Sequence, residues 1–552
     1  MHWWLLALEF CGYTPHALKA FYLVPVLFAC AFASCSSSGE TTQRFGLRDP
    51  QTLIVGRPAD AISLDPGRVT DNESVEVAAQ VYDTLLRYES GRTDIEPGLA
   101  VAWEVSADGT TWTFRLRRGV RFHDGTELNA DAVVFSFERQ RDPSHPFHRP
   151  DATGLPFVYW ENTYQNIQSV RAIDALTVEI KIEKPYAPFA ANMAMFPVSI
   201  VSPTAVRKYG DDFFKNPVGT GPFRFDSWKR DTIVLSRNKE YWGGKPNLKK
   251  LVFRTIPNGQ QRMVALESEL VDIAYSIPPD ELQFVALHPE LVVHKSPANS
   301  VAYLAMNTTR SPFTDIRVRR AVNMAVNKDM VVKLAYQGLA KPAHGPLPET
   351  VWGARLASSS DKYNRTQSIA LLKEAADEGT FDPQRTHRFF VSFTPRPYLP
   401  DPELVANVIR ANLKRVGVKT ELIVQEFPEH SQSLRRGEHD ICLLGWVGDN
   451  GDPDNFLYEL FVSKNAKAGV ARNVAFLSDN ELDALLIRGQ EDAERLVRES
   501  TYQLAQERIG KLAPWVPLAH AEIAVAANRS VAGIAMKPNS HIMYRGVRRV
   551  VP

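Results

Sequence analysis

The sequence is poor in cysteine, in net charge and in catalytic motifs, and each shortage excludes a class of protein. Three of the four cysteines lie within the first 35 residues, so the folded body keeps only Cys442 and cannot form an internal disulfide. A formal net charge of +1 leaves no basic field for nucleic acid. Neither a His-Glu-x-x-His nor a Gly-x-Ser-x-Gly motif occurs. A peptidase whose residues assemble only on folding stays open as an alternative.

Length and composition indicate a soluble protein of several domains. At 552 residues the chain is too long for one ordinary domain. A hydrophobic content of 44% with 23% charged residues is typical of globular proteins. We therefore expect three or four domains, with no metal and no cofactor indicated by any motif.

The N-terminus has the pattern of an export signal. Residues 20–34 form an apolar run after Lys19 that is too short to span a membrane as a stable helix. The tetrapeptide at 32–35, Phe-Ala-Ser-Cys, resembles the lipobox of bacterial lipoproteins and predicts lipid attachment at Cys35, followed by a Ser-rich tether. A plain signal peptide cleaved at this small-residue region is the alternative.

The most specific stretch is a loop at residues 445–456, Gly-Trp-Val-Gly-Asp-Asn-Gly-Asp-Pro-Asp-Asn-Phe. It follows a short apolar run that predicts a buried strand. A calcium loop is disfavoured, because Leu460 stands at the twelfth position from Asp449, where a carboxylate is needed. The three carboxylates either cap the following helix or, in one case, meet a cation at the mouth of a cleft.

This loop closely resembles that of the dipeptide-binding proteins of ATP-binding-cassette importers, within bacterial extracellular solute-binding protein family 5. The hairpin-rich run at residues 95–139 and the Gly-Thr-Gly-Pro-Phe turn at 219–223 also match the family. The resemblance implies that Asp449 holds the α-ammonium group of the ligand, with Trp446 and Gly448 beside it.

A second part of the site is predicted at a proline-rich segment, residues 394–400. Its prolines hold the backbone extended and present Arg396 at the end of an expected strand. The dipeptide-binding relatives carry Arg-Pro-Tyr here, which implies that Arg396 binds the ligand carboxylate and that Tyr398 lies nearby. A guanidinium suits this role because its planar fork donates two parallel hydrogen bonds.

Hydrophobic patterning predicts the elements around these loops. Residues 52–55 read as a strand, Val75 to Leu86 as one helical stretch, and Asp315 to Ala335 as one long helix. Asn129 is expected to cap a helix over residues 130–139. Helix and strand alternate after residue 366, which predicts α/β structure with largely parallel pairing.

The resemblance implies an α/β fold of the periplasmic binding protein type II-like class, with two large lobes and an extra domain around a ligand cleft that closes by a hinge. The expected division is a signal peptide at 1–35, a discontinuous domain I at 40–82, 204–297 and 518–552, domain II at 83–203, and domain III at 298–517.

The resemblance implies a receptor that is neither an enzyme nor cofactor-dependent. It is expected to be a monomer in the periplasm that passes short peptides to an inner-membrane permease. Dipeptides are the expected cargo. Relatives of similar sequence also carry haem, glutathione, cationic peptides or metal chelates, and these stay open as alternatives.

Overall fold

The computed structural model describes residues 49–550 except 70, 90–91, 150–163, 279–280, 355–361 and 538–540. The chain divides into two compact units, residues 1–48 and 49–552, and all described residues belong to the second. The predicted signal peptide and Cys35 lie outside the described residues.

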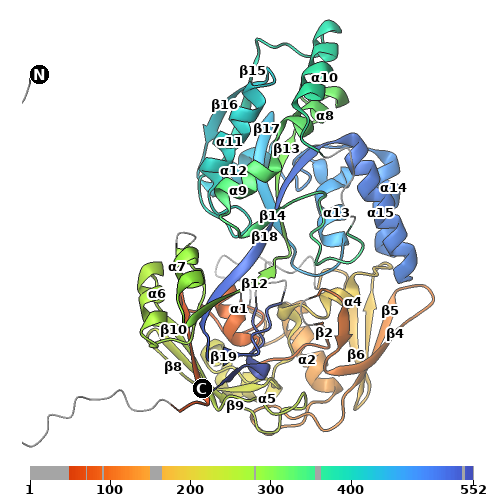
Figure 1. Cartoon of the computed structure of the whole chain (residues 1–552). Helices are drawn as coiled ribbons and strands as arrows, with labels where there is room; N and C mark the ends of the chain where they lie inside the picture. The colour runs from red at the N-terminus through yellow and green to blue at the C-terminus, as the bar shows by residue number, and fades with distance from the viewer. Residues whose placement is uncertain are drawn as a thin grey trace, which may run out of the picture. The chain divides into compact units, whose positions relative to one another are not determined.

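One long strand, β18 (Trp515–Asn528), connects two sections of a mixed sheet. Its first half pairs with β13 and β14, and its second half pairs with β11 and β12. Figure 1 shows β18 as the blue strand that runs through both sections. Both sections therefore share one continuous piece of backbone.

The first section has the strand order β8-β9-β10-β1-β11-β18, with β12 also on β18. Its strands are β1 (Thr52–Arg57), β8 (Phe223–Lys229), β9 (Thr232–Arg237), β10 (Lys250–Thr255), β11 (Ile273–Ala274) and β12 (Leu291–Pro297). Its helices are α1 (Asn72–Ala78), α5 (Pro203–Tyr209), α6 (Gly259–Glu267) and α7 (Leu282–Leu287). The short strands β19 (Val531–Ala532) and β20 (Arg548–Arg549) pair near the C-terminus.

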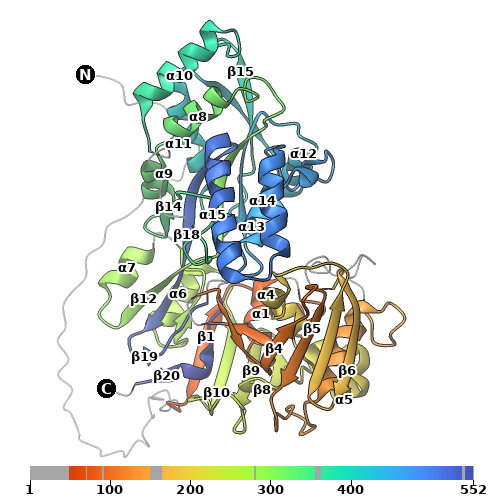
Figure 2. The ribbon, with the colours of Figure 1, turned by 90° about the vertical axis from the view of Figure 1, so that its right-hand side faces the viewer.

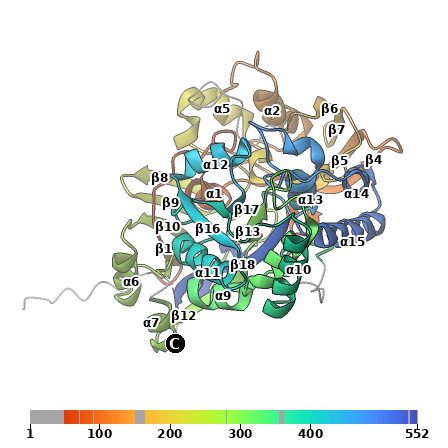
Figure 3. The same ribbon diagram turned by 90° about the horizontal axis from the view of Figure 1, so that it is seen from above.

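The second section has the order β16-β15-β17-β13-β18. Figure 3 views this part of the chain from above, with β13, β17 and β18 near the centre. Its strands are β13 (Ser300–Met306), β14 (Ala340–Pro342), β15 (Thr386–Val391), β16 (Lys419–Val424) and β17 (Ile441–Val447). Its helices are α8 (Ile316–Ala325), α9 (Lys328–Ala335), α10 (Arg365–Asp377), α11 (Pro402–Lys414), α12 (Phe427–Arg435), α13 (Asp454–Phe461), α14 (Asn480–Glu491) and α15 (Arg495–Leu512). Figure 2 shows α13, α14 and α15 packed together.

A separate four-stranded antiparallel sheet has the order β4-β5-β7-β6. Its strands are β4 (Ala100–Val105), β5 (Thr111–Leu116), β6 (Ile167–Asp174) and β7 (Thr177–Ile182), with the pair β2 (Leu86–Tyr88) and β3 (Ile95–Pro97) beside it. The helices are α2 (Ala130–Arg141) and α4 (Phe189–Asn192). As predicted, Asn129 caps α2 by accepting a hydrogen bond from the Ala132 N–H.

The α/β class is confirmed, and the parallel pairing predicted after residue 366 holds for β15 with β16 and β17 but not for β18. Only β15 pairs in parallel, with β16 and β17, whereas β13, β14 and β18 run antiparallel to their partners. The reason is that β12 and β13 follow one another along the same long strand, to which both run antiparallel. The division into three domains stays a prediction.

Two predicted helices are also wrong in extent. The helix expected to reach Leu86 ends at Ala78, because the next carbonyls, of Gln80 and Val81, accept hydrogen bonds from the distant backbone at Phe223 and Gly221. The long helix expected from 315 to 335 is two helices, α8 and α9. Asn327 divides them, since its side chain caps α9 through the Met330 N–H.

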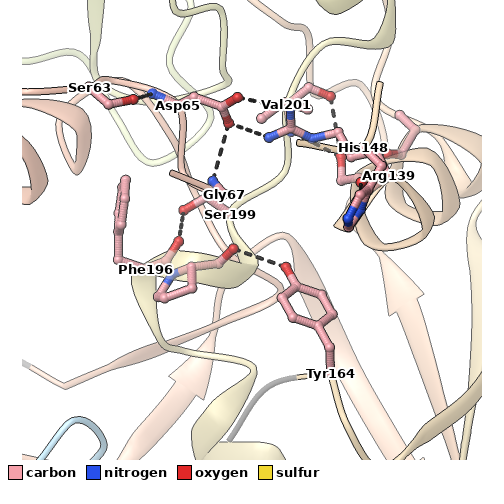
Figure 4. A network of polar contacts seen from close by, with 12 residues as sticks. Ser63, Asp65, Gly67, Arg139, His148, Tyr164, Phe196, Ser199 and Val201 are labelled. Atoms are coloured by element: carbon pink, nitrogen blue, oxygen red, sulfur yellow. Dashed lines mark hydrogen bonds and ion pairs between the residues drawn. The ribbon is translucent and has the colours of Figure 1, made fainter. Parts of the chain in front are cut away.

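A buried ion pair fixes the turn at residues 64–67 against α2 (Figure 4). Both carboxylate oxygens of Asp65 accept from the Arg139 guanidinium, and the Gly67 N–H donates to the same carboxylate. Further bonds surround the pair, including Tyr164 Oη to the Pro197 carbonyl at 3.1 Å. The turn that leads from β1 toward α1 is thereby held in place.

Within the ranges described, no helix combines the length and the apolar character that crossing a membrane requires. The same ranges contain no group of three or more His, Cys, Asp or Glu side chains that could hold a metal ion.

Candidate functional site

The two predicted ligand loops leave the same edge of the second section. Strands β15 and β17 are parallel neighbours, with Phe389 opposite Ile441 and Phe390 opposite Cys442. The segment that carries Arg396 follows β15, and the loop that carries Asp449 follows β17. The carboxyl ends of parallel strands in α/β sheets are where ligands commonly bind.

The loop after β17 is held by its own polar side chains. Asn455 Oδ1 accepts from the Asp449 N–H at 3.0 Å and from Trp446 Nε1 at 3.3 Å. Asn299 Nδ2 donates to the carbonyls of Gly448 and Asn450. A Cβ at Gly448 would lie 2.4 Å from Asn299 Nδ2, so this close approach requires glycine.

Two of the three carboxylates in this loop are engaged in the fold. Asp452 forms a buried ion pair with Arg498 at 2.6 Å and accepts from the Asp454 N–H at 3.0 Å. Asp454 accepts from Tyr186 Oη at 3.2 Å and Gln490 Nε2 at 3.1 Å. Burial and the neighbouring Asp452 charge raise the pKa of Asp454 to about 8. These two carboxylates are therefore structural.

Asp449 differs from both of them. Its carboxylate has no hydrogen bond or ion pair with any described residue, although its backbone N–H is bonded. Burial, with a smaller effect of the Glu459 charge, raises its pKa to about 6, while Arg472 lowers it. Arg472 is itself paired with Glu459 at 2.7 Å. An uncompensated, half-buried carboxylate is favourable for binding a cation.

Arg396 is the corresponding free cation. Its guanidinium stacks on the Phe427 ring, with the central carbon 3.4 Å from the ring centroid. Its Nε is buried and has no hydrogen-bond partner in the described part of the chain. The backbone forms a tight turn in which the Arg396 N–H donates to the Leu399 carbonyl and the Leu399 N–H donates to the Arg396 carbonyl. Stacking orients the side chain without neutralising its charge.

Arg396 lies on the wall of a cavity of about 570 Å³ between the two sections of the large sheet. The first section contributes polar groups from β1, α1 and the segment after β11; the second contributes the ends of β13 and β17. The charged and polar lining residues are Arg57, Asn72, Glu73, Glu76, Tyr275, Ser276, Asn299, Ser300, Arg396, Glu522 and His541. This volume is in the range of small-ligand pockets.

The structure brings only part of the predicted site to this wall. Arg396 lines it, whereas Asp449, Trp446, Gly448 and Tyr398 do not. The Tyr398 ring packs on Gly445, where a Cβ would lie 2.2 Å from Cδ2. The ligand roles of these five residues stay predictions.

Several cavity residues were missed by sequence reasoning, among them Glu73, Glu76, Tyr275, Glu522 and His541. No motif marks them, because they come from segments far apart in the chain. Glu522 could have been noticed, because an acidic residue is unusual in the middle of a long apolar strand such as β18.

Comparisons with known proteins show the family to which the chain belongs. The profile described as bacterial extracellular solute-binding proteins, family 5 Middle, matches residues 94–468. Haem-binding protein A of Haemophilus influenzae is 32% identical, covering 95% of this chain and 96% of its own. Di/tripeptide-binding protein 2 of Pseudomonas aeruginosa is 33% identical, covering 89% and 93%. The structure of the periplasmic binding protein DppA from Helicobacter pylori with the peptide STSA is 34% identical, covers 91% and 98%, and has a TM-score of 0.71.

Proposed function

Because the chain belongs to the bacterial extracellular solute-binding proteins, family 5, we propose that it is the receptor of an ATP-binding-cassette importer that captures short peptides by their charged ends. The receptor delivers them to an inner-membrane permease. Dipeptides are the cargo that this proposal favours.

The observation that supports it most is the contrast in charge pairing at the sheet edge. Asp452 and Asp454 are engaged, whereas Asp449 and Arg396, on neighbouring strand ends, have no ion-pair partner in the described structure. A zwitterionic ligand supplies both missing partners. Relatives of 33% and 34% identity are named for, or contain, short peptides.

Fixed charges at both ends select ligand length. One extended residue spans about 3.3–3.6 Å, so a single added residue moves the far terminus by that distance. Side chains between the ends can face water, because bridging waters adapt to different groups at small cost. Hinge closure around the ligand then removes both ion pairs from bulk water.

Haem is the second candidate cargo, because one relative of 32% identity is a haem-binding protein. An iron ligand would come from a His or Tyr on the wall. Tyr275 and His541 are there, but both bond the Glu76 carboxylate, His541 through Nδ1 at 3.1 Å. Their engagement in the fold favours the peptide.

Two measurements on the purified protein test the proposal. Native mass spectrometry, followed by release of any bound molecule, identifies the cargo directly. Calorimetry with dipeptides, tripeptides and haem then ranks affinities. Tight dipeptide binding is expected; binding of haem with no binding of peptides would overturn the proposal. Incubation with dipeptides should yield no cleavage products, since a receptor returns its ligand intact.

The proposed location is the periplasm, with a lipid anchor on Cys35. The support is the apolar run and the small residues before Cys35. Lipoprotein processing supplies more than one acyl chain, which stable attachment needs. Cys35→Ser should move the protein from the membrane fraction to the soluble fraction, and unchanged membrane retention would contradict the anchor.

A further inference from the structure

The charges on the wall of the 570 Å³ cavity do not balance once the protein's own pairs are removed. Arg57 is paired with Asp60 and also donates to the Glu73 carbonyl, while Asp60 accepts from Trp228 Nε1. Glu76 accepts from Tyr275, from His541 and from the Ile542 N–H. These groups are satisfied by the fold, so they offer little to a ligand.

Three charged groups on the wall remain available. The carboxylates of Glu73 and Glu522 have no hydrogen bond or ion pair with any other described residue, and neither does the Arg396 guanidinium. Two acids without a hydrogen-bond partner therefore face a cavity with one such base, and the charge of Glu73 is partly offset by the neighbouring Arg57. If Arg396 binds the ligand carboxylate and Asp449 binds the α-ammonium group, Glu73 and Glu522 remain available for a second cation on the ligand.

Glu522 stands where this cavity meets a smaller one of about 240 Å³. Ala298, Ala521 and Glu522 line both cavities. In the smaller cavity, Lys341 pairs with Glu349 at 3.1 Å, while Arg92 pairs with Asp94 at 3.1 Å. Glu522 thus keeps its charge uncompensated on both sides.

The smaller cavity has walls suited to a long aliphatic chain. They include Leu347, Val351 and Trp352, with Pro342 and Pro348. Lysine and arginine bury their methylene groups along such surfaces while the charged end reaches a polar partner. A long basic side chain therefore matches both the apolar walls and the acid at their edge.

Unused hydrogen-bonding capacity beside Glu522 points the same way. Asn299 and Ser300, each 2% exposed, line the larger cavity. Asn299 Oδ1 and Ser300 Oγ are buried without a hydrogen-bond partner among the described residues. The amide orientation is set by the two bonds that Asn299 Nδ2 donates, so Oδ1 is an acceptor, as a cation requires.

We propose that Glu522, with Glu73 as a second acid, makes this receptor selective for short peptides that carry a basic side chain. The cationic end of a Lys, ornithine or Arg side chain lies against the Glu522 carboxylate at the junction of the two cavities. This inference rests on the proposed peptide-receptor function and adds a side-chain preference to it.

The test compares matched peptides by calorimetry on the full folded protein. Ala-Lys and Lys-Ala are measured against Ala-norleucine and norleucine-Ala, which keep the aliphatic stem but lack the charge. The wild type should favour the lysine peptide of one pair by about tenfold, as expected for a partly desolvated charge pair. Glu522→Gln should reduce that preference to less than about twofold, and Glu73→Gln should reduce it less.

Two further variants control for fold and for overall charge. Glu127→Gln removes the same charge from an exposed position in the four-stranded region and should keep the wild-type preference. Glu522→Lys should reverse the preference, favouring Ala-Glu over Ala-Gln. Melting curves of each variant show whether it is folded, and the charge-reversed variant tests the site even if Glu522→Gln is destabilised.

The failures of the two proposals are distinguishable. If the wild type binds lysine and norleucine peptides equally, the side-chain preference is overturned while the peptide-receptor function stands. If Glu522→Gln weakens all peptides by the same factor, Glu522 holds a backbone group and the inference is again overturned. If the wild type binds no peptide of either kind, the proposed function itself fails.

Discussion

The loops after β15 and β17 start from neighbouring parallel strands but differ in how their polar groups are used. The loop after β17 is a closed polar network in which Asn455, Asp452 and Asp454 bond their own backbone or buried side chains. The loop after β15 is a proline-held turn that exposes one guanidinium to a cavity. The conspicuous motif therefore serves mainly to hold the fold, and the ordinary-looking one presents a free charge.

This contrast separates stability from binding within one sheet edge. Contacts of the β17 loop reach the four-stranded region through Tyr186 to Asp454 and Asn192 to Asn450. The β15 loop is tied within its own section instead, where Tyr336 Oη donates to the Tyr398 carbonyl at 2.8 Å. Breaking the buried Asp452 pair in the first loop should destabilise the fold, whereas replacing Arg396 in the second should change affinity.

The largest effect is expected from breaking the Asp452–Arg498 ion pair. Both side chains are buried, so Asp452→Ala leaves an unpaired charge and should cost about 3–5 kcal/mol in the free energy of unfolding. Urea denaturation measures it. Arg495→Ala, which breaks a more exposed pair with Asp94, should cost about 1 kcal/mol or less. Equal costs would contradict the structural role of the β17 loop.

Arg396→Ala should have the next largest effect, and on affinity only. Losing one partner of an ion pair that closure buries costs about 2–5 kcal/mol of binding, or roughly one and a half to three and a half decades in Kd. Calorimetry with a dipeptide measures this loss. Arg385→Ala, at the exposed opposite end of the same strand region, should bind normally. A large decrease in the free energy of unfolding of Arg396→Ala would contradict the claim that this side chain serves binding and not the fold.

Asp449 should make binding depend on pH. Its pKa of about 6 means that the carboxylate is mostly protonated below that value, and a protonated acid cannot pair with an ammonium group. Dipeptide affinity should therefore fall by about tenfold per pH unit below about 6 and level off above it. Asp449→Asn should bind weakly and lose this dependence.

N-acetylation of the dipeptide provides the matching test of Asp449. It should weaken binding to the wild type strongly and to Asp449→Asn little, because the variant has already lost the contact. An equal acetylation penalty in both proteins would mean that Asp449 does not hold the amine.

The smallest effect at neutral pH is expected for Asp454→Asn. With a pKa of about 8 in the fold and 3.8 as its ordinary value, Asp454 is mostly protonated at pH 7, and an amide replaces it without changing the charge. The folded state holds a proton that the unfolded chain releases between about pH 4 and pH 8, so raising the pH through this range lowers the free energy of unfolding. Melting temperatures of the variant should decline less over that range. Identical pH profiles would show that Asp454 is ionised in the fold.

Local chemistry explains what was predictable in the fold. Asn129 caps α2 through a residue three positions away, and such short-range bonds are visible in the sequence. The helix expected to reach Leu86 fails because Gly221 and Phe223 take the carbonyls after α1. A competitor so distant in sequence leaves no local pattern to read.

By itself, the sequence determined the family, the α/β class and the two loops at the sheet edge, because these depend on periodicity and on motifs of a few adjacent residues. Only the tertiary structure decided which charges are free. Asp449 and Asp452 look alike in the chain, but Arg498 neutralises one of them and no described residue neutralises the other. Likewise, Glu522 and Arg396 are far apart in the chain, and only the fold places both on the wall of one cavity. Charge pairing depends on distances in space, and folding sets those distances between segments that the sequence keeps apart.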